Sequence, residues 1–129
     1  MKRSLLIIAT ALLNLLDISA QAPPMEWHNC YGTDNGEHVH EGMQTSDLGY
    51  IGIGQTDEGE SEASDLLVIK INEDGTHEWQ KIIGTPGKTE VGLCVNEVDD
   101  GYLIGGGLFE SDRQQRYLAK LDVNGEFIW

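Results

Sequence analysis

Acidic side chains are concentrated in one segment of the chain, and their oxygen atoms have the chemistry to bind a cation. Residues 57–65 carry five carboxylates, which are Asp57, Glu58, Glu60, Glu62 and Asp65. Flexible, oxygen-rich loops suit Ca²⁺, which takes about six to eight oxygen ligands. The ligand register and closing Glu of an EF-hand loop are absent. We therefore interpret the segment as a solvated acidic loop, and these five residues are the calcium candidates; no other cofactor is predicted.

Other residues with ligating or catalytic potential do not form a recognised motif. His38 and His40 are two apart, so on a regular strand both side chains share a face, which suits zinc if a third ligand is near. For Cys30 and Cys94 we expect buried free thiols rather than a disulfide. The run Gly105-Gly106-Gly107 precedes neither a Lys-Ser or Lys-Thr pair nor a helix, so it does not predict a phosphate loop. The sequence identifies no catalytic residue.

The elements that would position these residues recur along the chain. Tryptophan appears at intervals of 52 and 50 residues, at Trp27, Trp79 and Trp129. Matching pairs lie between them, at Gly49-Tyr50 and Gly101-Tyr102, at Gly75 and Gly125, at Val39 and Val91, and at Asp47 and Asp99. A fixed period of this length is typical of a chain built from copies of one supersecondary unit. We place repeat 1 at about 27–78 and repeat 2 at about 79–129.

Short β-rich runs alternate with turn signals, which predicts an all-β fold. The expected strands are Glu26–Tyr31, His38–Thr45, Tyr50–Thr56, Leu66–Ile71 and Thr76–Ile83, then Glu90–Glu97, Tyr102–Leu108, Arg116–Leu121 and Glu126–Trp129. The run Leu66-Leu67-Val68-Ile69 is apolar on consecutive residues, which indicates a strand covered on both faces. Four strands per copy make an antiparallel meander, and meanders stacked around an axis make a β-propeller. We predict a partial propeller of about two blades; a β-sandwich and a β-solenoid are the alternatives.

Part of the sequence resembles one blade of a family of exported bacterial and archaeal propellers. That family's blades read roughly D-G-G-Y-I-x-x-G and then Y-L-x-K-L-D-x-N-G-x-x-x-W. The matching residues are 99–106, 117–125 and Trp129, and in the first copy 49–54, 68–75 and Trp79. The resemblance covers nearly all of residues 21–129. It implies a repeat of a large exported or surface protein and implies no particular activity.

Residues 1–20 are predicted to be a secretory signal peptide. The basic pair Lys2-Arg3 is followed by the apolar stretch Leu5–Leu16 and by small residues around Ala20. That stretch is short for a membrane span, and no later stretch is long enough for one. We therefore expect residues 21–129 to be secreted, periplasmic or at the cell surface, without a membrane span after cleavage.

Charge and length bound the partners of the exported chain. The net charge of the full sequence is −14, and such a charge repels phosphate backbones, so nucleic acid is not an expected partner. A blade buries both faces only against neighbours, and such folds need about three or more units. We therefore expect either a fragment of a longer chain, whose further blades complete the fold, or self-association of a two-blade protomer.

Taken together, these features predict a non-enzymatic binding or scaffold module, and the expected partner is a protein or a glycan at the cell surface. The alternative is part of a propeller-class enzyme, a hydrolase or lyase that acts on polysaccharide, whose site lies in blades missing from this chain.

Expression in a secreting host is expected to yield a chain that begins at Gln21, because the cut follows Ala20. Intact mass and mapping of the N-terminal peptide measure the cut. Ala20→Arg should block or move it, since only small side chains fit the position before the cut. A secreted product that still begins at Met1 would refute the signal-peptide prediction.

Overall fold

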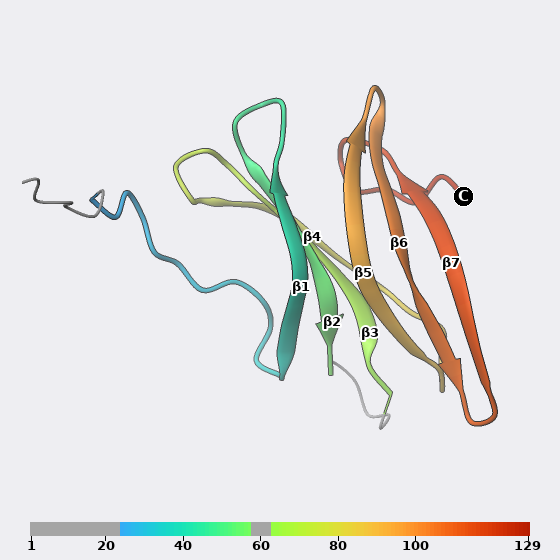
Figure 1. The fold of residues 1–129 in the computed structure, drawn as a ribbon. Helices are drawn as coiled ribbons and strands as arrows, with labels where there is room; N and C mark the ends of the chain where they lie inside the picture. The colour runs from blue at the N-terminus through green and yellow to red at the C-terminus, as the bar shows by residue number, and fades with distance from the viewer. Residues whose placement is uncertain (1–23, 58–62) are drawn as a thin grey trace, which may run out of the picture.

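The structure is a computed structural model that describes residues 24–57 and 63–129, and these residues form two antiparallel sheets (Figure 1). The first sheet has the strand order β1 (Glu37–Gln44), β2 (Tyr50–Thr56), β3 (Asp65–Ile71) and β4 (His77–Ile83). The second has the order β5 (Thr89–Val98), β6 (Gly101–Glu110) and β7 (Arg113–Leu121). The described residues contain no helix, so the prediction of an all-β fold with antiparallel sheets is confirmed. The predicted signal peptide, residues 1–20, lies outside the described residues.

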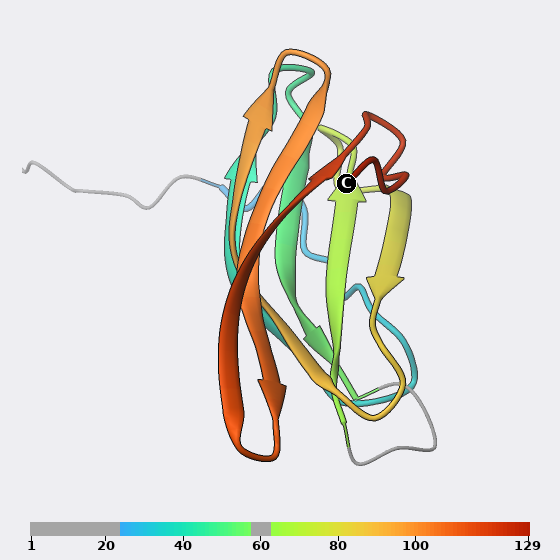
Figure 2. The same ribbon diagram turned by 90° about the vertical axis from the view of Figure 1, so that its right-hand side faces the viewer.

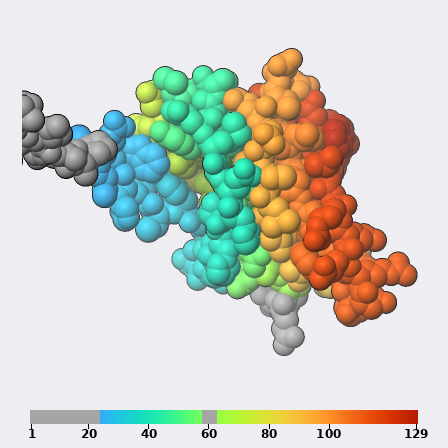
Figure 3. Space-filling model, in the orientation of Figure 1, coloured from blue at the N-terminus to red at the C-terminus, as the bar shows by residue number. Residues whose placement is uncertain are grey.

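The two sheets lie face to face as two layers, with the N-terminal segment against the far side of the first sheet (Figures 1–3). Between the sheets is the main core, formed by Ile51, Ile53, Leu66, Val68, Val95, Tyr102, Ile104, Ala119 and Leu121. A second cluster covers the other face of β3 and consists of Leu67, Ile69 and Ile71 with Trp27, Tyr31 and Tyr50. Strand β3 is therefore buried on both faces, as its unbroken apolar run predicts.

Two of the predicted strands differ from the structure. The prediction of a strand over Glu26–Tyr31 is wrong: this segment has no strand pairing, and Trp27 and Tyr31 pack instead against the face of the first sheet. The prediction over Glu126–Trp129 is met only in part, since one bridge joins Leu121 to Phe127. Two backbone hydrogen bonds continue it, from Ile128 N to Lys120 O and from Lys120 N to Trp129 O, both 2.8 Å. The second sheet thus has three strands and the beginning of a fourth.

Strand pairing corrects the alignment of the two copies along their first strands. Gly54 pairs with Val39 in the first sheet, and its counterpart Gly106 pairs with Gly92 in the second. Val39 therefore corresponds to Gly92 and not to Val91. The cause is the connection that follows, because five residues (45–49) separate the paired residues Gln44 and Tyr50 in the first sheet, whereas four residues (98–101) separate the equivalent pair Glu97 and Tyr102 in the second. A one-residue difference in a surface loop shifts the alignment of the strand before it.

Matched in this way, both first strands carry a one-residue β-bulge at the same position. The register shifts between Val39 and Glu41 in β1, and between Gly92 and Cys94 in β5. The extra residues are His40 and Leu93. A bulge interrupts the two-residue alternation of side chains. The expectation that His38 and His40 share a face assumes a regular strand, and the bulge at His40 removes that basis.

A tryptophan lies over a turn glycine in both sheets. Gly75 and Gly125 end the turns that follow β3 and β7, with φ of 79° and 78°. A Cβ atom on Gly75 would lie 2.5 Å from the Trp27 ring, and one on Gly125 would lie 2.7 Å from the Trp79 ring. Both turns therefore end in a glycine at positive φ. The second of these contacts ties β4 of the first sheet to the end of the second.

Each of these tryptophans also meets a tyrosine at the start of the second strand. The ring centroids are 5.7 Å apart for Trp27 and Tyr50, and 6.0 Å apart for Trp79 and Tyr102. Edge-on and tilted aromatic pairs at these separations add to the stabilisation from apolar burial. The same Trp–Tyr–Gly cluster is therefore built twice, once between the sheets and once between the first sheet and the N-terminal segment.

Gly125→Ala is expected to lower the free energy of unfolding by about 3 kcal/mol, from backbone strain at positive φ plus overlap with Trp79. Gly87→Ala is the matched control, because Gly87 has φ 77° and nothing within 4 Å of its missing Cβ. Its loss should be about 1 kcal/mol, from the backbone alone. Urea unfolding measures both losses; equal losses would show that the indole contact contributes nothing.

Candidate functional site: the turn face

The turns at one end of both sheets form the candidate site, here called the turn face. It consists of residues 45–49, 72–76, 98–101 and 122–126, which lie at the upper end of the sheets in Figure 1. Between the two sheets it contains a hollow of about 340 Å³, lined in part by Ser46, Glu97 and Tyr102. Ser46 crosses from the first sheet here, because its backbone N and hydroxyl donate to Glu97 at 2.7 and 2.8 Å. A hydrogen-bonded contact between the sheets therefore forms part of the wall of the hollow.

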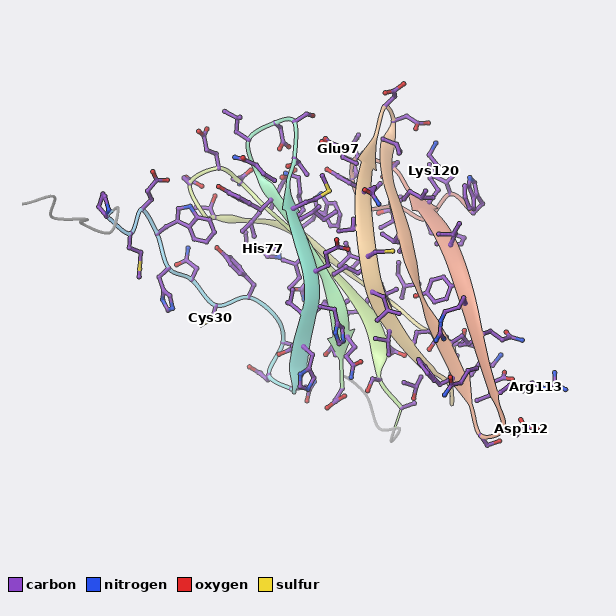
Figure 4. The ribbon with its side chains drawn as sticks, viewed as in Figure 1. Cys30, His77, Glu97, Asp112, Arg113 and Lys120 are labelled. Atoms are coloured by element: carbon purple, nitrogen blue, oxygen red, sulfur yellow. The ribbon has the colours of Figure 1, made fainter. Side chains whose placement is uncertain are left out.

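Carboxylates dominate the electrostatics of this end. Three lysines reach it, and each forms an ion pair: Lys70 with Asp47 and Glu78, Lys81 with Glu126, and Lys120 with Asp100. Further acids on or beside the turns are Glu73, Asp74, Glu97, Asp99 and Asp122. Glu97 and Lys120 are at this end in Figure 4, whereas Asp112 and Arg113 are at the opposite end. The turn face thus presents net negative charge.

Lys70 is the most buried of these charged groups, with 1% of its side chain exposed. Burial by itself would lower the pKa of its ammonium group, but hydrogen bonds from Nζ to Asp47 at 2.8 Å and Glu78 at 3.1 Å outweigh burial and raise it. The same bond, helped by the Thr45 hydroxyl, lowers the pKa of Asp47 to about 2. The pair fastens the loop between β1 and β2 to strand β3.

The second sheet has the corresponding pair, with Lys120 Nζ 2.6 Å from Asp100 Oδ1. The hydrogen bond that Lys120 Nζ donates to the Asp100 carboxylate lowers the pKa of Asp100. Asp47 therefore corresponds to Asp100, which corrects its alignment with Asp99. Sequence reasoning missed both pairs, although a lysine inside the apolar run of β3 was a signal that an acid had to meet it.

Of the five calcium candidates, Asp57 and Asp65 are among the described residues. Glu58, Glu60 and Glu62 lie outside the described residues. Asp57 accepts a hydrogen bond from the Ser64 hydroxyl at 2.7 Å, and Asp65 pairs with Thr56 in the ladder of β2 and β3. Within 24–57 and 63–129, no group of three or more His, Cys, Asp or Glu side chains is placed to hold a metal ion. The interpretation as a solvated acidic loop stays a prediction, with calcium binding as its alternative.

The two cysteines are free thiols, as expected, but both are exposed and not buried. Cys30 lies in the N-terminal segment, which has no strand to bury it. Cys94 directly follows the bulge of β5. Hydrophobicity alone predicts burial for cysteine, whereas the bulge and the missing strand decide the exposure here.

Sequence reasoning also missed two neighbouring polar residues of the second sheet, the buried Glu90 of β5 and the partly buried Tyr117 of β7. Glu90 is 6% exposed, and its backbone N donates to Ser64 O at 2.8 Å. Burial, and then the negative charge of Glu90, raise the pKa of Tyr117 to about 12. The Tyr117 hydroxyl and one Glu90 oxygen have no hydrogen-bond partner within the described part of the chain. This phenol stays protonated near neutral pH, so it cannot act there as a base.

Comparisons with known proteins do not supply a relative: no family model, curated protein or solved structure matches the chain. Among the described residues, no helix has the length and apolar character needed to cross a membrane. The function is therefore inferred from the geometry of the two sheets and of the turn face.

Asp47→Asn is expected to lower the free energy of unfolding at pH 6 by about 1 kcal/mol, because it leaves the buried Lys70 with one carboxylate, and the exposure of Asp47 screens the pair. The pKa of Asp47 is lowered on folding, so its contribution is present above about pH 4 and is lost as the pH falls toward about 2. The gap between wild type and variant should close over that range. Urea unfolding at several pH values measures it.

Asp100→Asn is the matched control, since Lys120 is 20% exposed where Lys70 is 1% exposed. Its effect should be smaller at every pH. Equal effects of the two variants would show that burial of Lys70 does not strengthen its dependence on Asp47.

Proposed function

We propose that this chain is an exported, partial β-propeller of about two blades, and that it serves as a non-enzymatic binding or scaffold module. Its partner is a protein or a glycan at the cell surface. The observation that carries the proposal is the Trp–Tyr–Gly cluster, because the same contact joins the N-terminal segment to the first sheet and the first sheet to the second. Contacts of one kind between successive four-stranded units are what a propeller requires.

The division between constant frame and variable turns supports binding. The corresponding residues of the frame keep their type: Trp27 and Trp79, Tyr50 and Tyr102, Gly75 and Gly125. The tips of the turns differ, since Glu73-Asp74 in the first sheet corresponds to Val123-Asn124 in the second. Loops that vary on a rigid frame are where binding residues concentrate. The acidity of the turn face favours a partner that presents positive charge.

Charge reversal on the turn face tests the proposal. Glu73→Lys places a positive charge at the tip of the turn between β3 and β4, and Asp112→Lys makes the same change on the hairpin at the opposite end. We expect wild type and Asp112→Lys to bind a cell-envelope fraction equally, and Glu73→Lys to bind about tenfold more weakly, mainly through a slower association rate. Surface-based kinetics measure both rates on glycan and protein fractions prepared separately.

Two results would count against this function. Absence of binding to either fraction would remove the binding role. Release of reducing ends or unsaturated sugars from polysaccharide by the folded chain would favour the enzyme alternative.

A further inference from the structure

The outer face of the first sheet, turned away from the second sheet, contains an apolar groove of about 520 Å³. Its lining includes Trp27, Val39, Tyr50, Gly52, Ile69 and Ile71. Val39 is 63% exposed there. The N-terminal segment covers part of this face and leaves the groove open beside it.

The corresponding face of the second sheet is fully occupied. Matched by strand register, Tyr50, Gly52, Ile69 and Ile71 correspond to Tyr102, Ile104, Ala119 and Leu121. These four counterparts are 0–4% exposed, because the first sheet packs on them. The groove on the first sheet is thus equivalent to the surface of the second sheet that the first sheet covers.

The core-facing surface of the first sheet also has a counterpart, which is the outer face of the second sheet. The first sheet contributes Ile51, Ile53, Leu66 and Val68 to the core, each no more than 1% exposed. By register they correspond to Leu103, Gly105, Arg116 and Leu118, on the outer face of the second sheet. Leu118 is 61% exposed. Two of the four positions keep an aliphatic side chain, so this outer face retains part of the character needed to enter the groove.

Large and small residues also alternate between the two outer faces. Inside the chain a large residue lies on a small one, because a Cβ on Gly92 would be 2.3 Å from Cγ1 of Ile53. The counterparts on the outer faces are Val39 for Gly92 and Gly105 for Ile53. Val39 is exposed, whereas Gly105 is buried beneath Cys94 and Leu118. The large and small partners are exchanged, and their combined volume changes only by the one methylene group that distinguishes Ile from Val. Close packing depends on that volume.

We propose that the groove of one copy accepts the outer face of the second sheet of another copy, so that copies pack head to tail. This inference rests on the proposed propeller, since the contact between the two sheets serves as the template. Such an interface joins different surfaces of the two copies, and it either closes into a ring or continues as an open array. A closed ring of about four to eight blades takes about two to four copies.

Two variants block the two surfaces separately. Gly52→Trp fills the groove, and a Cβ on Gly52 meets nothing nearer than Cγ1 of Val39 at 3.7 Å, so the fold has room for the change. Leu118→Asp places a charge on the outer face of the second sheet. Val123→Asp, at a residue 57% exposed on the turn face, is the matched control. Circular dichroism and thermal melts show whether each variant is folded.

Light scattering coupled to size exclusion measures the mass of the full chain, expressed and processed in a secreting host, over a dilution series. Wild type and Val123→Asp are expected to be oligomers of at least twice the mass of the processed chain. Gly52→Trp and Leu118→Asp are each expected to be monomers. Mixed in equal amounts, they should form a dimer and nothing larger, because the pair has one intact groove and one intact outer face.

A monomeric wild type at every concentration would overturn the proposal, as would a mixture of folded variants that stays monomeric. Oligomers of unchanged mass in either blocked variant would show that association uses another surface, which also overturns it. Binding to the cell envelope, measured with Glu73→Lys, is independent of these masses. A failure of self-association is therefore distinguishable from a failure of the proposed binding function.

Discussion

The contact between an indole ring and a turn glycine is the constraint on which the arrangement of the sheets depends. A side chain on Gly75 or Gly125 would overlap the tryptophan, and the positive φ at both positions favours glycine independently. Trp27 makes the contact although its segment forms no strand, and its indole donates to Glu73 O at 3.2 Å. A strand is therefore not required to place the indole over the turn, and in both sheets the tryptophan comes from the segment that precedes the sheet in the sequence.

The lysine–aspartate pairs connect this frame to the turn face. A buried ammonium group is strongly destabilising without partners, and Lys70 has two. The connections that supply Asp47 and Asp100 differ by one residue between equivalent ladder pairs, yet each brings its carboxylate to the lysine of the third strand. The ion pair with lysine fixes the position of the aspartate in each loop and leaves the remaining loop residues free to change. A rigid frame with variable loops follows from that separation.

The fold could be predicted from the sequence where local pattern and tertiary environment agree, and the site only in part. The unbroken apolar run of β3 predicts a strand buried on both faces, and Gly75 marks the turn that follows it. When the two copies are aligned at one fixed spacing, a loop that differs by one residue is not detected, because chance matches such as Val39 with Val91 support the wrong alignment. Glu26–Tyr31 has strand-like composition, but a strand also needs a partner. The turn face was missed because its residues are adjacent only after both sheets have stacked.

The bulges of β1 and β5 have a consequence for how copies of this chain meet one another. Both strands lie at sheet edges, and both are kinked at the corresponding residue, His40 or Leu93. A kinked edge is a poor template for a foreign strand, because its backbone donors and acceptors are out of step with a straight partner. Fibril growth through backbone pairing is disfavoured along these strands. Encounters between molecules are left to side-chain surfaces, which can separate again.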